Sequence, residues 1–239
     1  MTRRKWQPAF LITCEHGGNR VPHKYAALFA PHRDLLESHR GWDPGSRDMG
    51  AAFARALRAP LIASDVTRLL IDLNRSMRSR ARFSFITRAL SKEAQLEIFL
   101  DYYEPHWFEV MLAIPESRRR GRPLIHLGMH TFTPVFNGRV RRTDIGLLYD
   151  PTRRLERRFC DLWRSELREA RPDLTIHSNQ PYKGVSDGLP TMLRRLQAPT
   201  KYLGIELEVN QRFVGGPRFE WMKLIDTLTD ACRRAAASY

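Results

Sequence analysis

The chain has 239 residues, of which 42% are hydrophobic and 28% are charged. This length is sufficient to bury a sizeable core, and without a visible linker or repeat we expect one domain over residues 1–239. No apolar run approaches the roughly 18 residues that a membrane span requires, which excludes a transmembrane protein. The formal net charge of +14 is compatible with acidic substrates, anionic lipids or nucleic acids as partners.

The three cysteines, Cys14, Cys160 and Cys232, are odd in number and lack a metal-binding spacing. This pattern disfavours a disulfide framework and indicates a reducing compartment, so we expect a cytoplasmic protein. The basic residues before the apolar run at 9–14 superficially resemble a signal peptide. That run is too short for one and no small-residue cleavage site follows, so we expect a strand there instead.

Arginine supplies most of the positive charge, notably at 118–122 and 153–168. A nucleic-acid reader typically combines such a patch with an RNP, zinc-finger or helix-turn-helix signature, and we find none. We therefore interpret these arginines as a solvated surface and do not expect a nucleic-acid partner.

Short apolar runs rich in β-forming residues alternate with amphipathic stretches along the chain. This alternation predicts an α/β fold, a three-layer sandwich with a mixed, largely parallel twisted sheet. The predicted strands cover 9–14, 60–63, 68–72, 124–129, 145–149, 174–177 and 202–209.

Capping residues mark the predicted helices. Asp150, followed by Pro151, predicts an N-cap and a first helical position, and Ser91 caps a helix that Pro105 ends or kinks. Turn residues at 43–46 precede an amphipathic stretch. The predicted helices cover 47–57, 91–114, 150–168, 189–196 and a stretch from about 218.

Polar residues lie at the ends of four predicted strands. In an open α/β sheet the carboxyl ends of the strands converge on one crevice, where ligands bind. We therefore expect two imidazoles, an arginine and several carboxylates to meet there. The clusters are Glu15-His16, Asp72 to Arg75, His130, and Glu206 with Glu208.

His16 and His130 each follow a predicted strand, His16 beside two glycines. They are candidate zinc ligands, because neutral imidazole binds zinc readily and catalytic zinc keeps one position open. His126 is four residues before His130 and shares its strand face. It is either a substrate-contacting group or a packed, hydrogen-bonded histidine.

Asn74 and Arg75 open a polar loop at 74–90 that contains further arginines. An arginine at the crevice can hold a carboxylate through two parallel N–H bonds or stabilise the oxyanion of a tetrahedral intermediate. The alternative is a structural pair between Asp72 and Arg75 at a strand end.

Glu206 and Glu208 alternate with apolar residues, so both carboxylates point to one face of a strand. A carboxylate beside zinc can take a proton from water and deliver it to a departing amine. We interpret both as catalytic candidates.

Five motifs in order resemble the N-formylglutamate amidohydrolase family, over about residues 9 to 230. As an ordered set they are specific. They are Cys-Glu-His-Gly-Gly-Asn-Arg-Val-Pro at 14–22, Thr-Arg-Leu-Leu-Ile-Asp-Leu-Asn-Arg at 67–75, His-Thr-Phe-Thr-Pro at 130–134, Asn-Gln-Pro-Tyr-Lys-Gly at 179–184 and Gly-Ile-Glu-Leu-Glu-Val-Asn at 204–210.

This resemblance implies a zinc-dependent hydrolase related in fold to carboxypeptidases and aspartoacylases. It places His16 and His130 on the zinc, Asn74 and Arg75 on the substrate, and Glu208 in the role of base. Another divalent metal could replace zinc.

The third metal ligand departs from the related peptidases, which use His-x-x-Glu. The residue three positions after His16 is Asn19, a poor zinc ligand. The resemblance points instead to Asp43, which precedes a long helix, with Glu15 as the alternative. Tyr182 could donate its hydroxyl hydrogen to an oxyanion, or serve only in packing.

The sequence therefore predicts a cytoplasmic hydrolase whose substrate is a small anionic N-acyl amino acid, most simply N-formyl-L-glutamate, cleaved to formate and glutamate. One alternative is the same chemistry on another N-acyl amino acid or a short peptide. Another is a basic nucleic-acid-associated binding protein that retains the fold.

Overall fold

The computed structural model describes residues 8–117 and 123–239. Its centre is a six-stranded sheet in the order β2-β1-β3-β8-β6-β7. The first four strands of this order are mutually parallel, β6 is antiparallel to β8, and β7 is parallel to β6. The predicted mixed, largely parallel sheet is confirmed. The strands are β1 (Ala9–Cys14), β2 (Leu61–Ala63), β3 (Leu124–Phe132), β6 (Ile145–Leu148), β7 (Ile176–Ser178) and β8 (Tyr202–Asn210).

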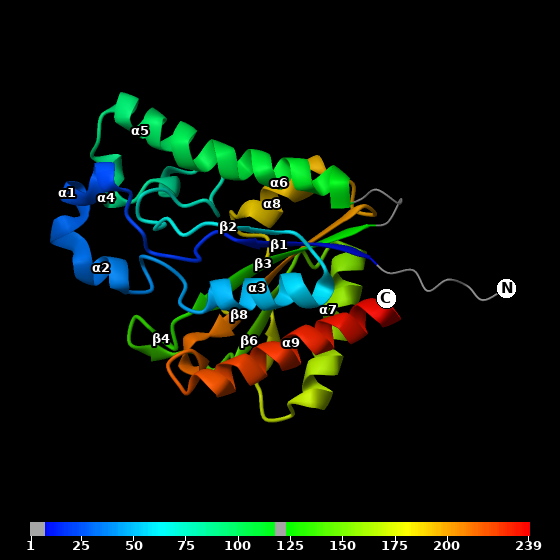
Figure 1. Cartoon of the computed structure of the whole chain (residues 1–239). Helices are drawn as coiled ribbons and strands as arrows, with labels where there is room; N and C mark the ends of the chain where they lie inside the picture. The colour runs from blue at the N-terminus through cyan, green and yellow to red at the C-terminus, as the bar shows by residue number, and fades with distance from the viewer. Residues whose placement is uncertain (1–7, 118–122) are drawn as a thin grey trace.

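Helices cover both faces of this sheet, which makes the predicted three layers (Figure 1). On one face, α3 (Ser46–Leu57), α7 (Arg154–Ala170) and α9 (Arg218–Ser238) bury Phe53, Trp163 and Leu224 against the strands. On the other face, α6 (Glu104–Ser117) and α8 (Leu189–Leu196) pack against β1, β3 and β8.

The remaining described elements are short and lie around the carboxyl ends of the strands or before α6. Helix α5 (Lys92–Ile98) leads through a π-helical turn (Phe99–Tyr103) into α6. The others are α1 (Ala26–Phe29), α2 (Arg33–Glu37), α4 (Phe85–Arg88), 3-10 turns at His23–Tyr25, Ala30–His32, Arg80–Arg82 and Gln211–Phe213, and the hairpin of β4 (Val135–Phe136) and β5 (Arg139–Val140).

The register of the central strands positions the polar residues of β8. On one side, β3 places His130 opposite Glu208. On the other side, the antiparallel β6 places Gly146 opposite Glu208. A Cβ at Gly146 would lie 2.1 Å from the Gln180 carbonyl oxygen, so only glycine allows the chain segment around Gln180 to pass this close.

The predicted strand at 68–72 is wrong. The chain turns there instead, with the Leu70 amide donating to the Thr67 carbonyl and the Asp72 amide donating to the Arg82 carbonyl. Leu69, Leu70 and Ile71 are buried in a cluster of loop and helix residues beside the sheet. The apolar run therefore indicated burial correctly, but short apolar runs do not distinguish a strand from a buried turn.

The helix predicted from Asp150 begins four residues later, at Arg154. The Asp150 carboxylate accepts hydrogen bonds from the Thr152 amide and hydroxyl, which makes a turn that holds Pro151 outside the helix. Ser91 caps α5 as predicted, because its hydroxyl accepts a hydrogen bond from the Ala94 amide. At Pro105 the helix continues, and the preceding turn is the π-helical one.

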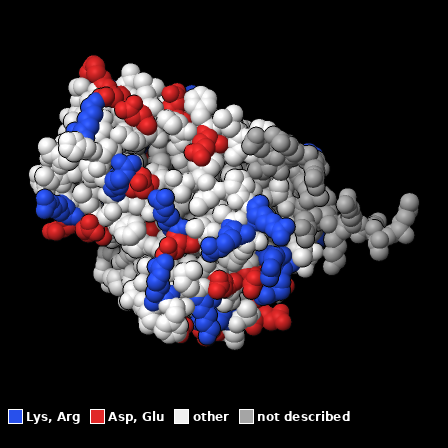
Figure 2. Space-filling model, viewed as in Figure 1, with Lys and Arg blue, Asp and Glu red and all other residues white. Residues whose placement is uncertain are grey.

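Basic and acidic side chains are interspersed on the face shown in Figure 2. Surface ion pairs such as Arg218 with Asp48, at 3.2 Å, contribute to this mixture. The arginine-rich segment 118–122 lies outside the described residues. None of the described helices is long and apolar enough to cross a membrane.

Candidate active site and metal centre

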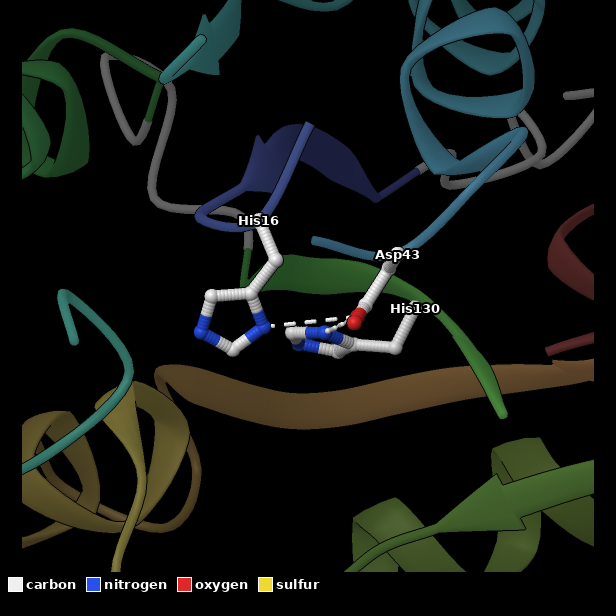
Figure 3. A group of neighbouring side chains, drawn as sticks. All are labelled: His16, Asp43 and His130. Atoms are coloured by element: carbon white, nitrogen blue, oxygen red, sulfur yellow. Dashed lines mark hydrogen bonds and ion pairs between the residues drawn. The ribbon is translucent and has the colours of Figure 1, made fainter. Parts of the chain in front are cut away.

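A histidine, an aspartate and a second histidine converge at the carboxyl edge of the sheet (Figure 3). His16 lies in the turn after β1, Asp43 lies shortly before α3, and His130 lies within β3. Asp43 Oδ2 is 3.3 Å from His16 Nδ1 and 3.0 Å from His130 Nδ1. All three side chains are buried, and one ligand atom from each lies within 4.8 Å of the others.

These atoms have the spacing that neighbouring ligands of one ion require. Bonds of about 2.0–2.1 Å at tetrahedral angles separate two zinc ligands by about 3.3 Å. The other ring nitrogen of His16, Nε2, is 2.7 Å from Asp72 Oδ1. Donation of an N–H to this carboxylate leaves the lone pair on Nδ1, as a metal ligand needs. The three residues therefore fit a divalent metal ion such as zinc.

Arg68 connects the carboxylates of this group. Its Nη1 lies 3.2 Å from Asp43 Oδ1 and its Nη2 lies 3.0 Å from Asp72 Oδ2. Burial raises the pKa of both aspartates, but the Arg68 charge and the histidine contacts outweigh burial and hold each pKa below its usual range. Both carboxylates are therefore available as anions.

The two glutamates of β8 have different surroundings. Glu206 Oε1 accepts a hydrogen bond of 2.9 Å from Asn74 Nδ2 and lies 3.7 Å from His130 Nε2. Glu208 Oε2 is buried without a hydrogen-bond partner among the described residues. Burial raises the pKa of Glu208 to about 8. Glu208 therefore titrates near neutral pH and has a free oxygen.

Asn74 and Arg75 are held by the loop that leads into α8. Asn74 Oδ1 accepts a 2.6 Å hydrogen bond from the Leu189 amide, and Arg75 Nη1 donates to the Asp187 carbonyl at 2.7 Å. Arg75 Nε lies 3.9 Å from Asp72 Oδ2, and the side chain is 33% exposed. The guanidinium is thus positioned by backbone contacts with part of its surface open.

These side chains surround a cavity of about 450 Å³. Four basic side chains take part in its lining: Arg40, Arg68, Arg75 and Lys183. An anionic ligand would therefore meet compensating positive charge. The lining includes these predicted site residues: His16, Asp43, Asn74, Arg75, His130, Tyr182, Glu206 and Glu208.

His126 does not line this cavity. It is fully buried, with its ring nitrogens 2.8 Å from Thr13 Oγ1 and 2.6 Å from the Tyr202 hydroxyl. Burial lowers its pKa to about 4. His126 is therefore a hydrogen-bonded interior histidine here, and we do not carry it into the proposed site.

Tyr182 lies at the cavity with its hydroxyl accepting a 3.1 Å hydrogen bond from Arg141. Its side chain is exposed, with the Arg141 guanidinium 5.1 Å from the ring centroid. The hydroxyl keeps its own hydrogen for donation, because it accepts from Arg141.

The sequence reasoning missed Arg68 and the role of Asp72 as the partner of His16. Both lie within the motif at 67–75, and their opposite charges were the available signal for an ion pair. Of the two alternatives for the third ligand, Asp43 is within the group that could hold a metal, whereas Glu15 lies behind His130 with Oε2 3.4 Å from Nε2.

In an open α/β sheet the crevice at the strand ends is where ligands bind, and in this chain that crevice holds histidines and carboxylates. The sequence comparison gives the family. The chain belongs to the N-formylglutamate amidohydrolase family, whose model matches residues 9–214. This confirms the resemblance of the five motifs. A comparison with curated proteins gave no significant match.

Two solved structures share the fold over nearly the whole chain. The first is gene product Atu2144 from Agrobacterium tumefaciens, with a TM-score of 0.82 and 26% identity over 97% of this chain and 91% of that chain. The second is N-formylglutamate amidohydrolase from Ralstonia eutropha JMP134, with a TM-score of 0.72 and 19% identity over 98% and 94% of the two chains.

Proposed function

We propose that this protein is a metal-dependent amidohydrolase that cleaves N-formyl-L-glutamate to formate and glutamate. The observation that carries the proposal is the buried group of His16, Asp43 and His130, which opens into the same cavity as Glu208 and four basic side chains. Family membership supports amide hydrolysis, and the positive lining supports an anionic substrate.

His16 Nδ1, Asp43 Oδ2 and His130 Nδ1 would hold the metal, which we propose to be zinc. When bound, zinc lowers the pKa of water toward ~7 and polarises a carbonyl oxygen. Asp72 and Arg68 act behind these ligands. Asp72 orients the His16 ring, and Arg68 keeps both aspartates ionised and in place.

Glu208 serves as the general base and then as the general acid. Its Oε2 has no hydrogen-bond partner among the described residues and can accept a proton, and burial raises its pKa above that of a free carboxyl, which favours the return of a proton. It accepts a proton from the attacking water as the new C–O bond forms at the formyl carbon. It then returns a proton to the amide nitrogen as the C–N bond breaks, so that formate and the free amino acid leave.

Arg75 and Asn74 position the substrate. The open part of the Arg75 guanidinium can grip a carboxylate or the developing oxyanion with two parallel N–H bonds. Asn74 holds Oε1 of Glu206, whereas Oε2 of Glu208 has no hydrogen-bond partner among the described residues. Tyr182 can donate its hydroxyl hydrogen to an anionic oxygen at the cavity.

The size of the cavity favours one second candidate, hydrolysis of a larger N-acyl amino acid or short peptide by the same residues. At about 450 Å³ the cavity lies within the ~300–1,000 Å³ range of pockets that bind drug-sized ligands. N-formylglutamate is smaller than such ligands, so a longer acyl group or a second residue also fits the available volume.

Metal analysis joined to a substrate panel tests this proposal. We expect about one zinc per chain after incubation with zinc, and formate release from N-formyl-L-glutamate that exceeds release from N-formyl-L-glutamine. Faster cleavage of N-acetyl or dipeptide substrates would favour the second candidate.

The controls are His16→Ala and His130→Ala, which should lose both zinc and turnover. A wild-type protein that stays metal-free, with both variants unchanged in activity, would reject the metal centre.

We also propose a cytoplasmic location. All three cysteines are free and buried, as is usual for proteins in a reducing compartment.

A further inference from the structure

Behind His130, on the side away from Asp43, lies a buried carboxylate that the proposed reaction does not use. Glu15 follows β1 and is 1% exposed. Its Oε2 is 3.4 Å from His130 Nε2 and its Oε1 is 3.9 Å from Nε2 of His106, which is itself 9% exposed on α6. Neither residue is part of the cavity lining.

Burial of the Glu15 carboxylate lowers the stability of the fold unless neighbouring groups compensate its charge through opposite charges or hydrogen bonds. Neither oxygen of Glu15, nor Nε2 of His106, has a hydrogen bond among the described residues. The two imidazoles are therefore the groups that compensate Glu15, and His130 is the nearer one.

His130 needs an acceptor on this side. Its Nδ1 faces Asp43 Oδ2 at 3.0 Å, so a metal bound with Asp43 would use Nδ1 and leave the hydrogen on Nε2. Two other side chains are near Nε2. Asn74 Nδ2, at 3.4 Å, is itself a donor, and Glu206, at 3.7 Å, already accepts from Asn74. Glu15 is the closest acidic acceptor.

We propose that Glu15 is a positioning residue for the metal centre: its buried carboxylate, 3.4 Å from His130 Nε2 and not hydrogen-bonded to it in this structure, favours the hydrogen on Nε2 electrostatically and thereby directs Nδ1 toward the ion. His106 holds Glu15 from α6. The arrangement parallels the other metal-binding histidine, where Asp72 accepts from His16 Nε2 at 2.7 Å. Each histidine ligand is then backed by its own carboxylate. The inference rests on the proposed metal function and deepens it.

The same geometry excludes Glu15 from the ligand set. Nδ1 and Nε2 lie on different edges of the imidazole ring. Glu15 Oε2 is near Nε2, at 3.4 Å, whereas Asp43 Oδ2 is near Nδ1, at 3.0 Å. Glu15 therefore acts through His130, whereas Asp43 is the carboxylate of the ligand group.

Zinc affinity measured by competition with a chromophoric chelator tests the inference without any substrate. The variants are Glu15→Gln, which keeps the size but removes the charge, and His106→Asn. Loss of a carboxylate that orients a histidine ligand typically costs 10–100-fold in metal affinity, and we expect this range for Glu15→Gln. We expect a smaller loss, below about tenfold, for His106→Asn, because it acts one contact further away.

Glu156→Gln is the matched control. Glu156 is equally buried, but it pairs with Arg194 at 3.0 Å and lies outside the cavity lining. It should lose stability without a change in zinc affinity, which separates a positioning role from general weakening of the fold. The Co²⁺-loaded absorption spectrum should also change in Glu15→Gln and not in Glu156→Gln, because it reports the ligand geometry.

The outcomes distinguish this inference from the proposed function. If the wild type binds no metal, the proposed metal centre itself fails. If the wild type binds one zinc and Glu15→Gln binds it equally tightly, Glu15 does not position His130. If the wild type binds two ions and Glu15→Gln only one, Glu15 is a ligand and the inference is wrong. If Glu15→Gln does not fold, unchanged affinity in His106→Asn overturns the inference.

Discussion

Two arginine–carboxylate assemblies among the described residues, one with a buried arginine and one with a partly exposed arginine, differ in how much of their hydrogen-bonding capacity is filled. In the interior, Glu156 accepts from Arg194 Nε and from the amides of Gly204 and Asp150. Arg194 also donates to the carbonyls of Gly184 and Gly204. The assembly joins α7, α8 and β8, and its charged groups are surrounded by partners from the chain itself.

At the strand ends, Arg68 shares its donors between Asp43 and Asp72, and these aspartates also contact His16. Asp43 contacts His130 as well. Beside them, one oxygen of Glu208 is buried without a partner among the described residues. The carboxylate of Glu156 therefore has hydrogen-bond partners on both oxygens, whereas Glu208 beside the strand-end assembly has one oxygen without a partner among these residues. The unpaired oxygen of Glu208 thus lies at the cavity, where a ligand can reach it, whereas the carboxylate of Glu156 is fully bonded within the chain.

The largest expected effect is on kcat and comes from changing Glu208, the glutamate with an unpaired buried oxygen at the cavity. Glu208→Gln should keep the fold and zinc binding but lose ~10²–10⁴-fold in kcat, because the amide is nearly isosteric and cannot accept a proton. Steady-state kinetics of formate release would measure it. The parallel Glu206→Gln should be milder, since Glu206 is already bonded to Asn74. A loss below tenfold for Glu208→Gln would remove it from the role of base.

The second prediction compares the loss of unfolding free energy when Arg194 or Arg68 is replaced by alanine. Arg194→Ala leaves Glu156 buried without its charge partner and should lower the free energy of unfolding by ~3–5 kcal/mol. Arg68→Ala should cost less, about 1–3 kcal/mol, because Asp43 and Asp72 keep their histidine contacts. Urea unfolding of both variants would measure the difference. Equal losses would show that the strand-end assembly is as structural as the interior one.

The third prediction concerns pH and the interior histidine. His126 has its pKa lowered to about 4 by burial, so the unfolded chain binds its proton first as the pH falls below about 6.5. The stability that neutral His126 contributes is complete above pH 6.5 and is lost between about 6.5 and 4. The total loss is about 3 kcal/mol.

His126→Gln should remove this proton-linked part of the stability profile. Its unfolding free energy should fall less steeply than that of the wild type between pH 6.5 and 4, and run parallel to it above pH 7. Parallel curves over the whole range would show that His126 is not held neutral.

The smallest expected effect is at Arg75. Its guanidinium donates a hydrogen bond to the Asp187 carbonyl, and part of its side chain is exposed. Arg75→Lys keeps the charge but removes the planar fork, and we expect a loss of about tenfold in kcat/KM. A rise in KM alone would indicate an anchor for a substrate carboxylate, and a fall in kcat would indicate an oxyanion role. An unchanged variant, with its preference for the acid over N-formyl-L-glutamine intact, would return Arg75 to a structural role.

The sequence predicts His16, His130 and Glu208 as neighbours because one simple rule applies to them. Polar residues that follow buried parallel strands must meet at one edge, and the register of β3 and β8 brings His130 and Glu208 together as expected. Asn74 and Arg75 instead reach the cavity from a loop that follows the wrongly predicted strand. Asp43 was reached only through the resemblance, since it follows no strand. Its contacts with His16 and His130 span 27 and 87 residues, and no local pattern encodes them.

The predictions that were wrong concern segments whose local sequence pattern is compatible with two different structures. Leu69 to Ile71 are as apolar as a strand but pack in a buried turn, and Asp150 makes a turn with Thr152 rather than capping the helix. His126 shares a strand face with His130, yet the Tyr202 hydroxyl and Thr13 enclose it. Which of two histidines reaches a cavity depends on neighbours from other strands. The single-domain organisation stays a prediction.

The absence of a side chain at Gly146 has a consequence for anyone who wishes to alter what this protein accepts. Because β6 runs against β8, this position is flanked by Glu208 on one side and by the backbone of Gln180 on the other, two residues before Tyr182. Even alanine there would push the 179–184 segment outward. A mutagenesis screen that keeps Gly146 and varies Tyr182 and Lys183 should therefore change the cavity lining without displacing the 179–184 segment. A library that also varies position 146 should contain many variants in which this segment is displaced.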